Sequence, residues 1–249
     1  MIILKSRDEI SRLKRSNRLA AQVMNMMSEM VKPGVTTAEL DRRAEEFIVK
    51  NGAKPAFKGY MGYKHTLCIS TNEEVVHGIP GSRTLEEGDI VGIDCGVLLD
   101  DFYGDHAWTF PVGSVNDDAK KILAKGEEAL MTGIAEATVD HRLYDISHAI
   151  QMVAEKSGFS VVRDYVGHGI GTELHEEPQV PNFGEPGTGI RLRAGLTMAL
   201  EPMLNQGTHE VEVLQDGWTV VTKDRKLSVH FEHSIAVTEE GPIVLSVMD

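Results

Sequence analysis

Two periods of hydrophobic and polar residues can be followed along the chain, and the first is that of an amphipathic helix. Apolar residues recur at roughly helical spacing between positions 10 and 27. Residues Ser6 to Glu9 fit a capping box ahead of this run, and Pro33-Gly34 ends it. Further helices are expected over residues 36–52, 116–139 and 143–157, the last followed by Gly158 as a C-cap.

The second period is that of short β-strands, which occur in two regions punctuated by Gly, Pro and Asp. The first region holds runs at residues 67–70, 89–99 and 102–112, and the second holds runs at 196–204, 217–222, 228–238 and 242–246. Helices followed by strands therefore occur twice, in residues 1 to about 112 and about 115 to 249. This order predicts an α/β (α+β) fold, with a single domain over 1–249 made of two pseudo-symmetric halves.

Composition and charge narrow the class of protein. The chain has 249 residues, of which 41% are apolar and 25% charged, as in an ordinary soluble domain. No apolar run reaches the roughly 18 residues of a membrane span, and residues 1–18 lack the apolar stretch of a signal peptide. A net charge of −13 argues against bulk binding to nucleic acid or to an anionic membrane. We expect a cytoplasmic monomer with no membrane association and no specific nucleic-acid partner.

Four acidic residues interrupt the apolar β-like runs, namely Asp94, Asp105, Glu201 and Glu232. Charged side chains are rarely buried unless they are paired or bind a metal. Asp94 and Asp105 are spaced for neighbouring strands of a hairpin whose tip holds residues 98–101. Each acid alone is more simply an edge-strand or turn residue. Together they carry four negative charges that two divalent ions would cancel, so the pattern favours a dinuclear metal site.

Histidines strengthen this interpretation. His77 follows an apolar dipeptide, and His168 and His175 belong to the glycine-rich segment 167–178. A glycine on each side of His168 permits close approach of a metal or ligand. By strand alternation, His106 and His233 should face away from the adjoining acids, whereas His230 shares the face of Glu232.

In their order and spacing, these residues resemble type I methionine aminopeptidase, a member of the pita-bread metallopeptidases of family M24A. The resemblance runs from Pro55 to Glu232 with short gaps, and the chain begins almost directly at the first expected helix, as in the short bacterial form. Besides the two aspartate motifs, the matching segments are Gly59–Tyr63, Cys68–Ser70, Asn72–Pro80, Gly88–Ile90, Gly167–Pro178, Leu200–Met203, Asp216–Trp218 and Phe231–His233. The resemblance implies a central curved, mainly antiparallel sheet flanked by helices.

The resemblance also implies roles for individual residues. The metal ligands would be Asp94, Asp105, His168, Glu201 and Glu232, with Glu201 also moving a proton. His77 and His175 match the two active-site histidines that do not bind metal. The methionine side chain would be lined by Tyr60, Tyr63, Cys68 and Trp218, an apolar and polarisable set that suits a thioether. Phe57, Leu174 and His230 depart from the family pattern. The first two could reshape this pocket, and His230 could tune the metal site as a hydrogen-bond partner.

The implied activity is hydrolysis of the first peptide bond of nascent proteins and peptides that begin with methionine and have a small second residue. The cofactors would be two divalent ions per chain, of Co, Mn, Fe or Zn, which the sequence cannot tell apart. Transient contact with the ribosome would need a local basic surface despite the acidic chain. The nearest cluster is Lys50, Lys54, Lys58 and Lys64.

Two other functions remain open at this point. Xaa-Pro aminopeptidases and prolidases of the same fold carry comparable ligands, but they usually have an additional N-terminal domain and lack the Gly-Tyr-x-Gly-Tyr segment of residues 59–63. A non-catalytic pita-bread protein that binds a partner would tend to lose ligands. This chain retains all five, together with both histidines.

Overall fold

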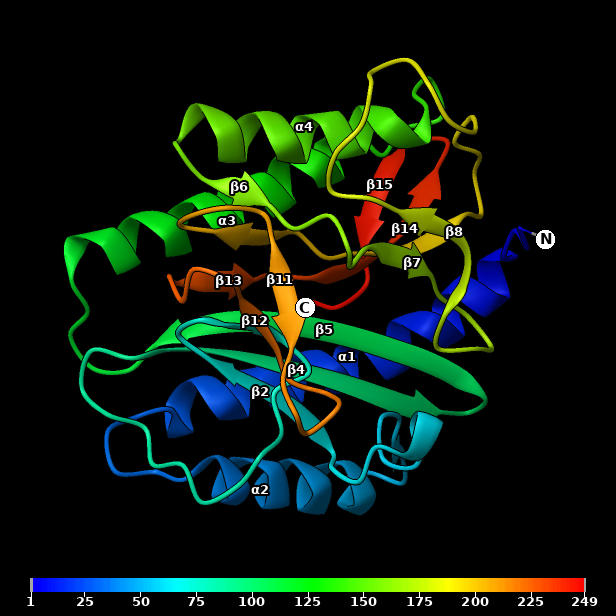
Figure 1. The fold of residues 1–249 in the computed structure, drawn as a ribbon. Helices are drawn as coiled ribbons and strands as arrows, with labels where there is room; N and C mark the ends of the chain where they lie inside the picture. Colours follow the sequence, from blue (N-terminus) through cyan, green and yellow to red (C-terminus); the bar gives the residue numbers. More distant parts are fainter. Residues whose placement is uncertain (1, 249) are drawn as a thin grey trace.

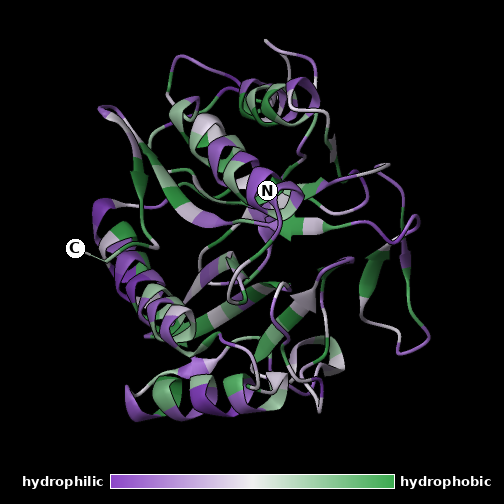
Figure 2. Cartoon of the chain, turned by 90° about the vertical axis from the view of Figure 1, so that its left-hand side faces the viewer, coloured by the Kyte–Doolittle hydropathy of each residue, from purple (hydrophilic) through white to green (hydrophobic). Residues whose placement is uncertain are grey.

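Helices form the outer layers of the molecule and strands lie between them (Figure 1). The structure is a computed structural model that describes residues 2–248. Helices α1 (Arg7–Met30) and α2 (Thr37–Lys50) cover one side, and α3 (Asp117–Ala135) and α4 (Leu143–Lys156) cover the other. Hydrophilic and hydrophobic residues alternate along these helices in Figure 2, as expected for helices with one buried face. Within residues 2–248, no helix is both long and apolar enough to cross a membrane.

The helix ends follow the capping signals of the sequence. The Ser6 side chain accepts a hydrogen bond from the amide of Glu9, and the Glu9 carboxylate accepts one from the amide of Ser6, which confirms the capping box. Helix α3 ends at Ala135, before the expected end at residue 139. A ring nitrogen of His141 lies 2.9 Å from the carbonyl oxygen of Glu136, so a side chain takes the place of a helical amide there.

The first sheet contains the hairpin that the sequence predicts. It comprises β1 (Lys54–Pro55), β2 (Leu67–Thr71), β4 (Ile90–Leu99) and β5 (Phe102–Pro111), all paired antiparallel. The turn between β4 and β5 holds Asp100 and Asp101, with φ of 52° and 65°. Two consecutive residues with positive φ make the tight turn that matches the twist of a hairpin. A short 3-10 helix, η1 (Tyr60–Gly62), precedes β2.

The second sheet has the antiparallel order β15-β14-β9-β7-β8. These strands are β15 (Gly241–Val244), β14 (His233–Thr238), β9 (Thr197–Leu200), β7 (Gly167–Gly169) and β8 (Glu176–Val180). The remaining strands form two small sheets. One pairs β10 (Met203–Asn205) with β13 (Ser228–His230) and β6 (Ser160–Val161), and the other pairs β12 (Val220–Thr222) with β11 (Val211–Val213) and β3 (Glu74–Val76). Because β3 pairs with β12, strands from both halves of the sequence share a sheet.

Two of the predicted strands prove to be interrupted. The run at residues 196–204 is divided between β9 and β10, and the run at 228–238 is divided between β13 and β14. The interruptions fall at Glu201-Pro202 and Phe231-Glu232. Proline cannot donate to a strand ladder, which accounts for the first break. Glu201 and Glu232 therefore lie between strands, and the expectation that they lie within strands is wrong.

Two hydrophobic clusters fill the spaces between helices and strands. One packs α3 and α4 on the strands of the second sheet, and the other packs α1 and α2 on β2 and β4. Trp108 of β5 contacts both clusters. The site described below lies where the two sheets approach each other, so packing on each side determines how the sheets face one another.

A buried asparagine ties helix α1 to the strand that carries Asp105. Asn17 is fully buried, and its Oδ1 accepts a hydrogen bond of 3.1 Å from the amide of Asp105. Its Nδ2 donates to the carbonyl of Leu13 at 3.0 Å. The helix approaches so closely that a Cβ on Gly104 would lie 2.5 Å from the backbone nitrogen of Asn17. The strand position of Asp105 therefore depends on a polar contact with α1.

Replacing Asn17 by alanine should destabilise the protein, because the buried amide of Asp105 would lose its hydrogen-bond acceptor. The expected loss is about 1–3 kcal/mol in the free energy of unfolding, measured by urea denaturation of metal-free protein. Asn25→Ala, at an exposed position of the same helix, should change stability by less than about 0.5 kcal/mol. Equal stability of the two variants would contradict the proposed role of Asn17.

Candidate metal centre

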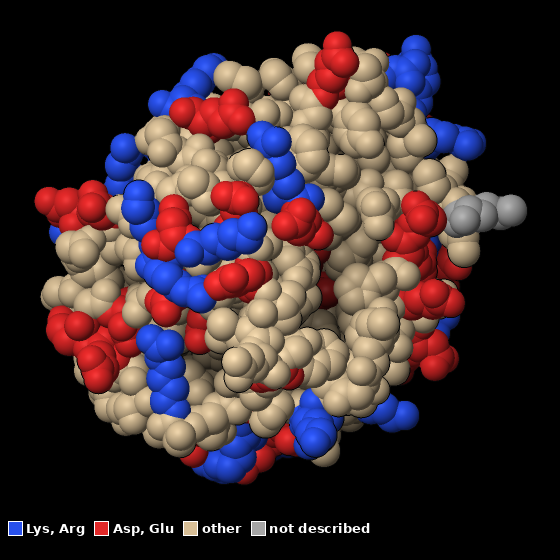
Figure 3. All heavy atoms as spheres, viewed as in Figure 1, with Lys and Arg blue, Asp and Glu red and all other residues tan. Residues whose placement is uncertain are grey.

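A cavity of about 730 Å³ opens between the first and second sheets. Figure 3 shows that this face of the molecule is hollowed near its centre, with acidic atoms inside the hollow. The first sheet contributes Asp94 and Asp105 to the lining, and the second sheet and its flanking segments contribute His168, Glu201 and Glu232. Five of the residues singled out in the sequence therefore meet in one place.

Strand register places the two aspartates on the same face of the first sheet. Asp105 on β5 is the Cα partner of Gly96, and Asp94 on β4 is the partner of Ala107. Since Asp94 and Gly96 are two residues apart, they share a face, and Asp105 is the diagonal neighbour of Asp94. The predicted hairpin is confirmed, and its register brings two carboxylates together.

The second sheet brings the two glutamates together by a different route. His233 of β14 pairs with Leu200 of β9, so Glu232 and Glu201 leave the ends of adjacent strands side by side. The amide of Glu232 donates 2.8 Å to the carbonyl of Ala107 on β5, which joins the second sheet to the first. His168 occupies the neighbouring strand β7, opposite Ala199.

The donor atoms of these side chains converge at short range. One donor atom from each of Asp105, His168 and Glu232 lies within 4.8 Å of the others. His168 Nε2 is 3.8 Å from Asp105 Oδ2 and 3.6 Å from Glu201 Oε1. The other ring nitrogen, Nδ1, lies 2.9 Å from the carbonyl oxygen of Gly169. If Nδ1 donates its hydrogen there, the lone pair of Nε2 faces the carboxylates.

Three carboxylates in this cluster each have one oxygen atom without a hydrogen-bond donor among the described residues. Oδ1 of Asp94, Oδ1 of Asp105 and Oε1 of Glu232 are buried and accept no hydrogen bond from any group within residues 2–248. Burial raises the pKa of Asp94 to about 7. Burial also raises the pKa values of Asp105 and Glu232 well above their usual range, and the neighbouring carboxylates raise them further.

Glu201 differs from the other three acids because two histidines adjoin it. Burial raises the pKa of Glu201, but contact with His230 and the proximity of His168 outweigh burial and leave this pKa below its usual value. Four carboxylates, three of which have a buried oxygen atom without a hydrogen-bond donor in the described part of the chain, and one imidazole form a donor set suited to divalent metal ions. The residues present therefore fit such an ion.

Two further histidines border the cavity without joining the donor cluster. The ring of His175 lies 4.3 Å from that of His168, centre to centre, and its Nδ1 is 2.8 Å from the hydroxyl oxygen of Tyr60. Desolvation of its ring inside the cavity and the nearby His168 lower the pKa of His175 to about 4, although part of the residue is exposed to solvent. Burial likewise lowers the pKa of His77, which packs edge-on against Tyr165. Both imidazoles are therefore neutral at pH 7.

Part of the cavity wall is apolar. The rings of Tyr63 and Trp218 meet edge to face, with centroids 4.9 Å apart. The hydroxyl of Tyr63 donates to the carbonyl of Leu67 at 2.9 Å, so its ring remains an apolar wall. Cys68, Phe57 and Leu174 also line the cavity. Burial and Asp94 raise the pKa of the Cys68 thiol well above its usual value, which keeps the thiol neutral.

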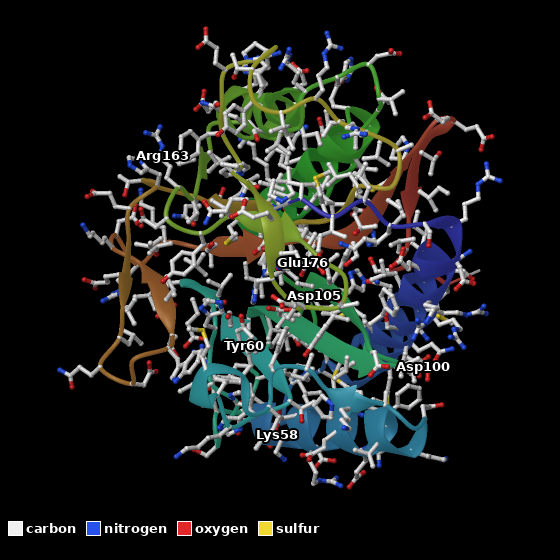
Figure 4. All side chains as sticks on the ribbon, turned by 90° about the vertical axis from the view of Figure 1, so that its right-hand side faces the viewer. Lys58, Tyr60, Asp100, Asp105, Arg163 and Glu176 are labelled. Atoms are coloured by element: carbon white, nitrogen blue, oxygen red, sulfur yellow. The ribbon has the colours of Figure 1, made fainter. Side chains whose placement is uncertain are left out.

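The structure brings every sequence-predicted site residue to this one cavity or to its rim. The labelled Tyr60, Asp105 and Glu176 lie together near the centre of Figure 4, whereas Lys58 and Arg163 lie toward its edges. His106 and His233 face away, as predicted, and stack with ring centroids 4.7 Å apart beside Trp108. Sequence reasoning missed Ile3 and Glu176, which also line the cavity. No periodic pattern marks either residue.

His230 approaches the cluster from behind Glu201. Its Nε2 lies 3.6 Å from Glu201 Oε2, is buried, and has no hydrogen-bond partner within residues 2–248. The neighbouring backbone is fixed, because the amide of His230 donates to Thr109 Oγ1 and its carbonyl accepts from the same hydroxyl. The ring is therefore aimed at Glu201 and can orient this carboxylate.

Comparison with known proteins identifies what the chain is similar to. The sequence pattern of metallopeptidase family M24 matches residues 11–239. The chain is 52% identical to the methionine aminopeptidase of Clostridium perfringens over 248 residues, which cover 100% of both proteins. The crystal structure of methionine aminopeptidase from Thermotoga maritima superimposes with a TM-score of 0.98 at 44% identity, with 100% of both chains covered.

Another solved structure is similar in fold but more distant in sequence. Prolidase from Pyrococcus furiosus matches with a TM-score of 0.81 at 23% identity, and the match covers 99% of this chain but 66% of the prolidase. This similarity shows the shared fold alone. Together with the Thermotoga structure, it confirms the pita-bread fold that the sequence predicts.

Replacing His230 by leucine should weaken metal binding, because Glu201 would lose the ring that orients it. We expect a roughly 10- to 100-fold weaker affinity for Mn²⁺, measured by calorimetric titration of metal-free protein. His230→Gln keeps a side-chain donor and should remain within a few-fold of the unchanged protein. If leucine and glutamine have the same effect, hydrogen bonding by His230 is not what holds Glu201.

Proposed function

Because the chain belongs to metallopeptidase family M24, we propose that it is a dinuclear-metal methionine aminopeptidase. It would remove the N-terminal methionine from nascent proteins and peptides, with a preference for a small second residue. The observation that carries this proposal is a single cavity lined both by converging carboxylates and by the aromatic wall of Tyr63 and Trp218. A peptide that enters with its first side chain against the aromatic wall has its first peptide bond beside the carboxylates.

Asp94, Asp105, His168, Glu201 and Glu232 would hold two divalent ions. The four carboxylates offer a charge of −4 when ionised, which two such ions neutralise. When bound, the ions supply Lewis-acid chemistry and lower the pKa of water. The donor set accepts Co, Mn, Fe or Zn, so availability rather than ligand chemistry would decide which metal is used.

Glu201 is placed to move a proton during hydrolysis. Its carboxylate is part of the cavity wall and is more exposed than those of Asp105 and Glu232. It would accept a proton from the attacking water and pass it to the nitrogen of the leaving peptide. This role overlaps with metal binding, so a substitution of Glu201 would disturb both.

His175 is the better candidate to stabilise the developing oxyanion. The Tyr60 hydroxyl can donate to its Nδ1, which leaves Nε2 carrying the hydrogen. A neutral imidazole with hydrogen on Nε2 is a donor toward a substrate carbonyl oxygen beside His168. His77 would orient the substrate backbone.

The apolar part of the cavity wall suits methionine by shape and polarisability. Tyr60, Tyr63, Cys68 and Trp218 would surround the thioether, and Phe57 and Leu174 would narrow the space around it. The backbone of Trp218 is fixed because its amide donates 2.8 Å to Oδ1 of Asp216. Phe57 packs on β4 so closely that a Cβ on Gly96 would lie 2.5 Å from its ring.

The proposed reaction would take place in the cytoplasm, close to the ribosome. Nascent chains as substrates require a cytoplasmic location and transient contact with the ribosome. The lysines at 50, 54, 58 and 64 form the basic cluster that such contact would use, although Lys58 is paired with Glu45 at 2.6 Å. We further propose that the enzyme acts as a monomer, without a membrane or a specific nucleic-acid partner.

The proposed function predicts selective hydrolysis of Met-Ala-Ser over Ala-Pro-Ala by metal-free protein reconstituted with Mn²⁺ or Co²⁺. The released amino acid is measured by chromatography, with and without chelator. Release of methionine alone, abolished by chelator, supports the assigned pocket and site. Cleavage of the proline peptide instead would indicate an Xaa-Pro peptidase. Cleavage of neither peptide, with two metals bound, would favour a non-catalytic binding protein.

Replacing His175 by alanine should lower kcat for Met-Ala-Ser by roughly 10²- to 10³-fold, because a donor to the oxyanion is lost. Metal content, measured by mass spectrometry of the dialysed protein, should stay at the level of the unchanged enzyme. His141→Ala, at a partly exposed histidine outside the cavity, serves as the matched control and should retain full activity. Loss of metal from His175→Ala would show that His175 belongs to the donor set.

A further inference from the structure

The N-terminal segment of residues 2–5 lies against the wall of the active-site cavity. Ile3 is part of the lining, and the amide of Lys5 donates 2.7 Å to the carbonyl of Gly195. In Figure 1 this segment enters from the side of the molecule where β8 and β14 lie. The segment precedes α1 and is outside every motif that the sequence analysis used.

Lys5 forms a buried ion pair with Glu176. The side chains are 4% and 9% exposed, and Lys5 Nζ also donates 3.1 Å to the carbonyl of Ile3. The ion pair packs against Gly171, where a larger residue would not fit. A Cβ at this position would lie 2.3 Å from Glu176 Oε1 and 2.5 Å from Lys5 Cε. A buried charge that loses its partner is strongly unfavourable, so the pair stays closed in the folded protein.

Glu176 is adjacent in the chain to His175 and closes the loop that carries it. Its Oε1 accepts a hydrogen bond of 3.3 Å from the amide of Glu173, and the amide of Gly171 donates 3.1 Å to the carbonyl of Glu173. The carbonyl of Gly171 in turn accepts from the amide of Tyr103, on the strand that carries Asp105. The loop is thereby connected by hydrogen bonds to the metal-binding hairpin.

Few side chains of this loop pack against the rest of the protein. Among residues 172–175, Leu174 is buried, whereas Thr172, Glu173 and His175 are exposed. His175 contacts Tyr60 of η1, and the side chain of Tyr60 is also exposed. The position of His175 therefore depends on polar anchors at the base of the loop, and the Lys5–Glu176 pair is the buried one.

We propose that Lys5 is a positioning residue for catalysis, which acts through Glu176 to hold His175 at the correct place beside the substrate. This inference rests on the proposed aminopeptidase function. Catalytic groups must be held to about 0.5 Å, and a displacement of about 1 Å can cost roughly 100-fold in rate. The N-terminal segment, which lies before the first helix, thus becomes part of the catalytic apparatus.

The first test compares Lys5→Met with Lys125→Met. Methionine preserves much of the length of lysine and removes its charge, and Lys125 forms an exposed pair with Glu128 on α3, away from the cavity. For Lys5→Met we expect kcat on Met-Ala-Ser to fall about 100-fold, with KM within about threefold and metal content unchanged. Lys125→Met should match the unchanged enzyme. A kcat of Lys5→Met within twofold of the unchanged enzyme overturns the proposal.

A second variant keeps the proposal testable if Lys5→Met does not fold. Replacing both partners, as Lys5→Met with Glu176→Met, leaves no buried charge unpaired and should restore folding. This double variant should fold with metal bound and still show a lowered kcat, because the directional anchor is gone. A folded double variant with the kcat of the unchanged enzyme overturns the proposal.

A spectroscopic measurement separates this inference from the proposed function. The imidazole signal of His175 in nitrogen-15 spectra of metal-free protein is assigned by its loss in His175→Ala. It should shift or broaden in the Lys5 variants and remain in place in Lys125→Met. An unmoved signal in the Lys5 variants overturns the inference. Failure of the unchanged enzyme to release methionine would instead reject the proposed function, while this signal would still report on the ion pair.

Discussion

Mutual repulsion among buried carboxylates is the constraint on which the rest of this structure depends. Asp94, Asp105 and Glu232 have buried oxygen atoms without hydrogen-bond donors from residues 2–248, Asp94 raises the pKa of Asp105, and both aspartates raise the pKa of Glu232. Flexible elements would let such groups separate. The fold prevents separation by placing two of them on a hairpin of two ten-residue strands and the third on a segment hydrogen-bonded to that hairpin. Cations relieve the repulsion, so rigid strands and metal affinity are two aspects of one arrangement.

Sequence alone could predict the parts of this arrangement that depend on local pattern. Helical periodicity and capping located α1 and α2, and the hairpin of β4 and β5 followed from two apolar runs around an Asp-Asp turn. The candidate metal-binding acids stood out in the sequence, because carboxylates within apolar runs need a special reason. Composition could not reveal that Glu201 and Glu232 stand in breaks between strands. Pro202 is a local cause of the first break, but the second lies where the chain passes from the sheet of β13 to that of β14, which is a long-range property of the fold.

Other site contacts were beyond prediction because they join segments remote in sequence. Lys5 meets Glu176 across 171 positions, and Asn17 meets Asp105 across 88. A lysine in a charged N-terminal segment and an asparagine in an amphipathic helix look like surface residues. Strands β7 and β8 were missed for a related reason, because glycine and acidic residues dominate them. Their place in the sheet comes from the pairing of β7 with β9 and of β8 with β7, and not from β-propensity.

Polar contacts, rather than apolar packing, connect the outer elements of this molecule to its site. An apolar pair in place of Lys5 and Glu176 could be just as stable, because desolvation offsets much of the attraction between buried charges. What an apolar pair lacks is direction, since methyl groups pack acceptably over a range of displacements. A lysine that contacts one carboxylate and one carbonyl fixes both a distance and an orientation. Such contacts have most value where a group must be held on an exposed loop, as His175 is. The ligands on strands need them less, because strand register already fixes where those side chains lie.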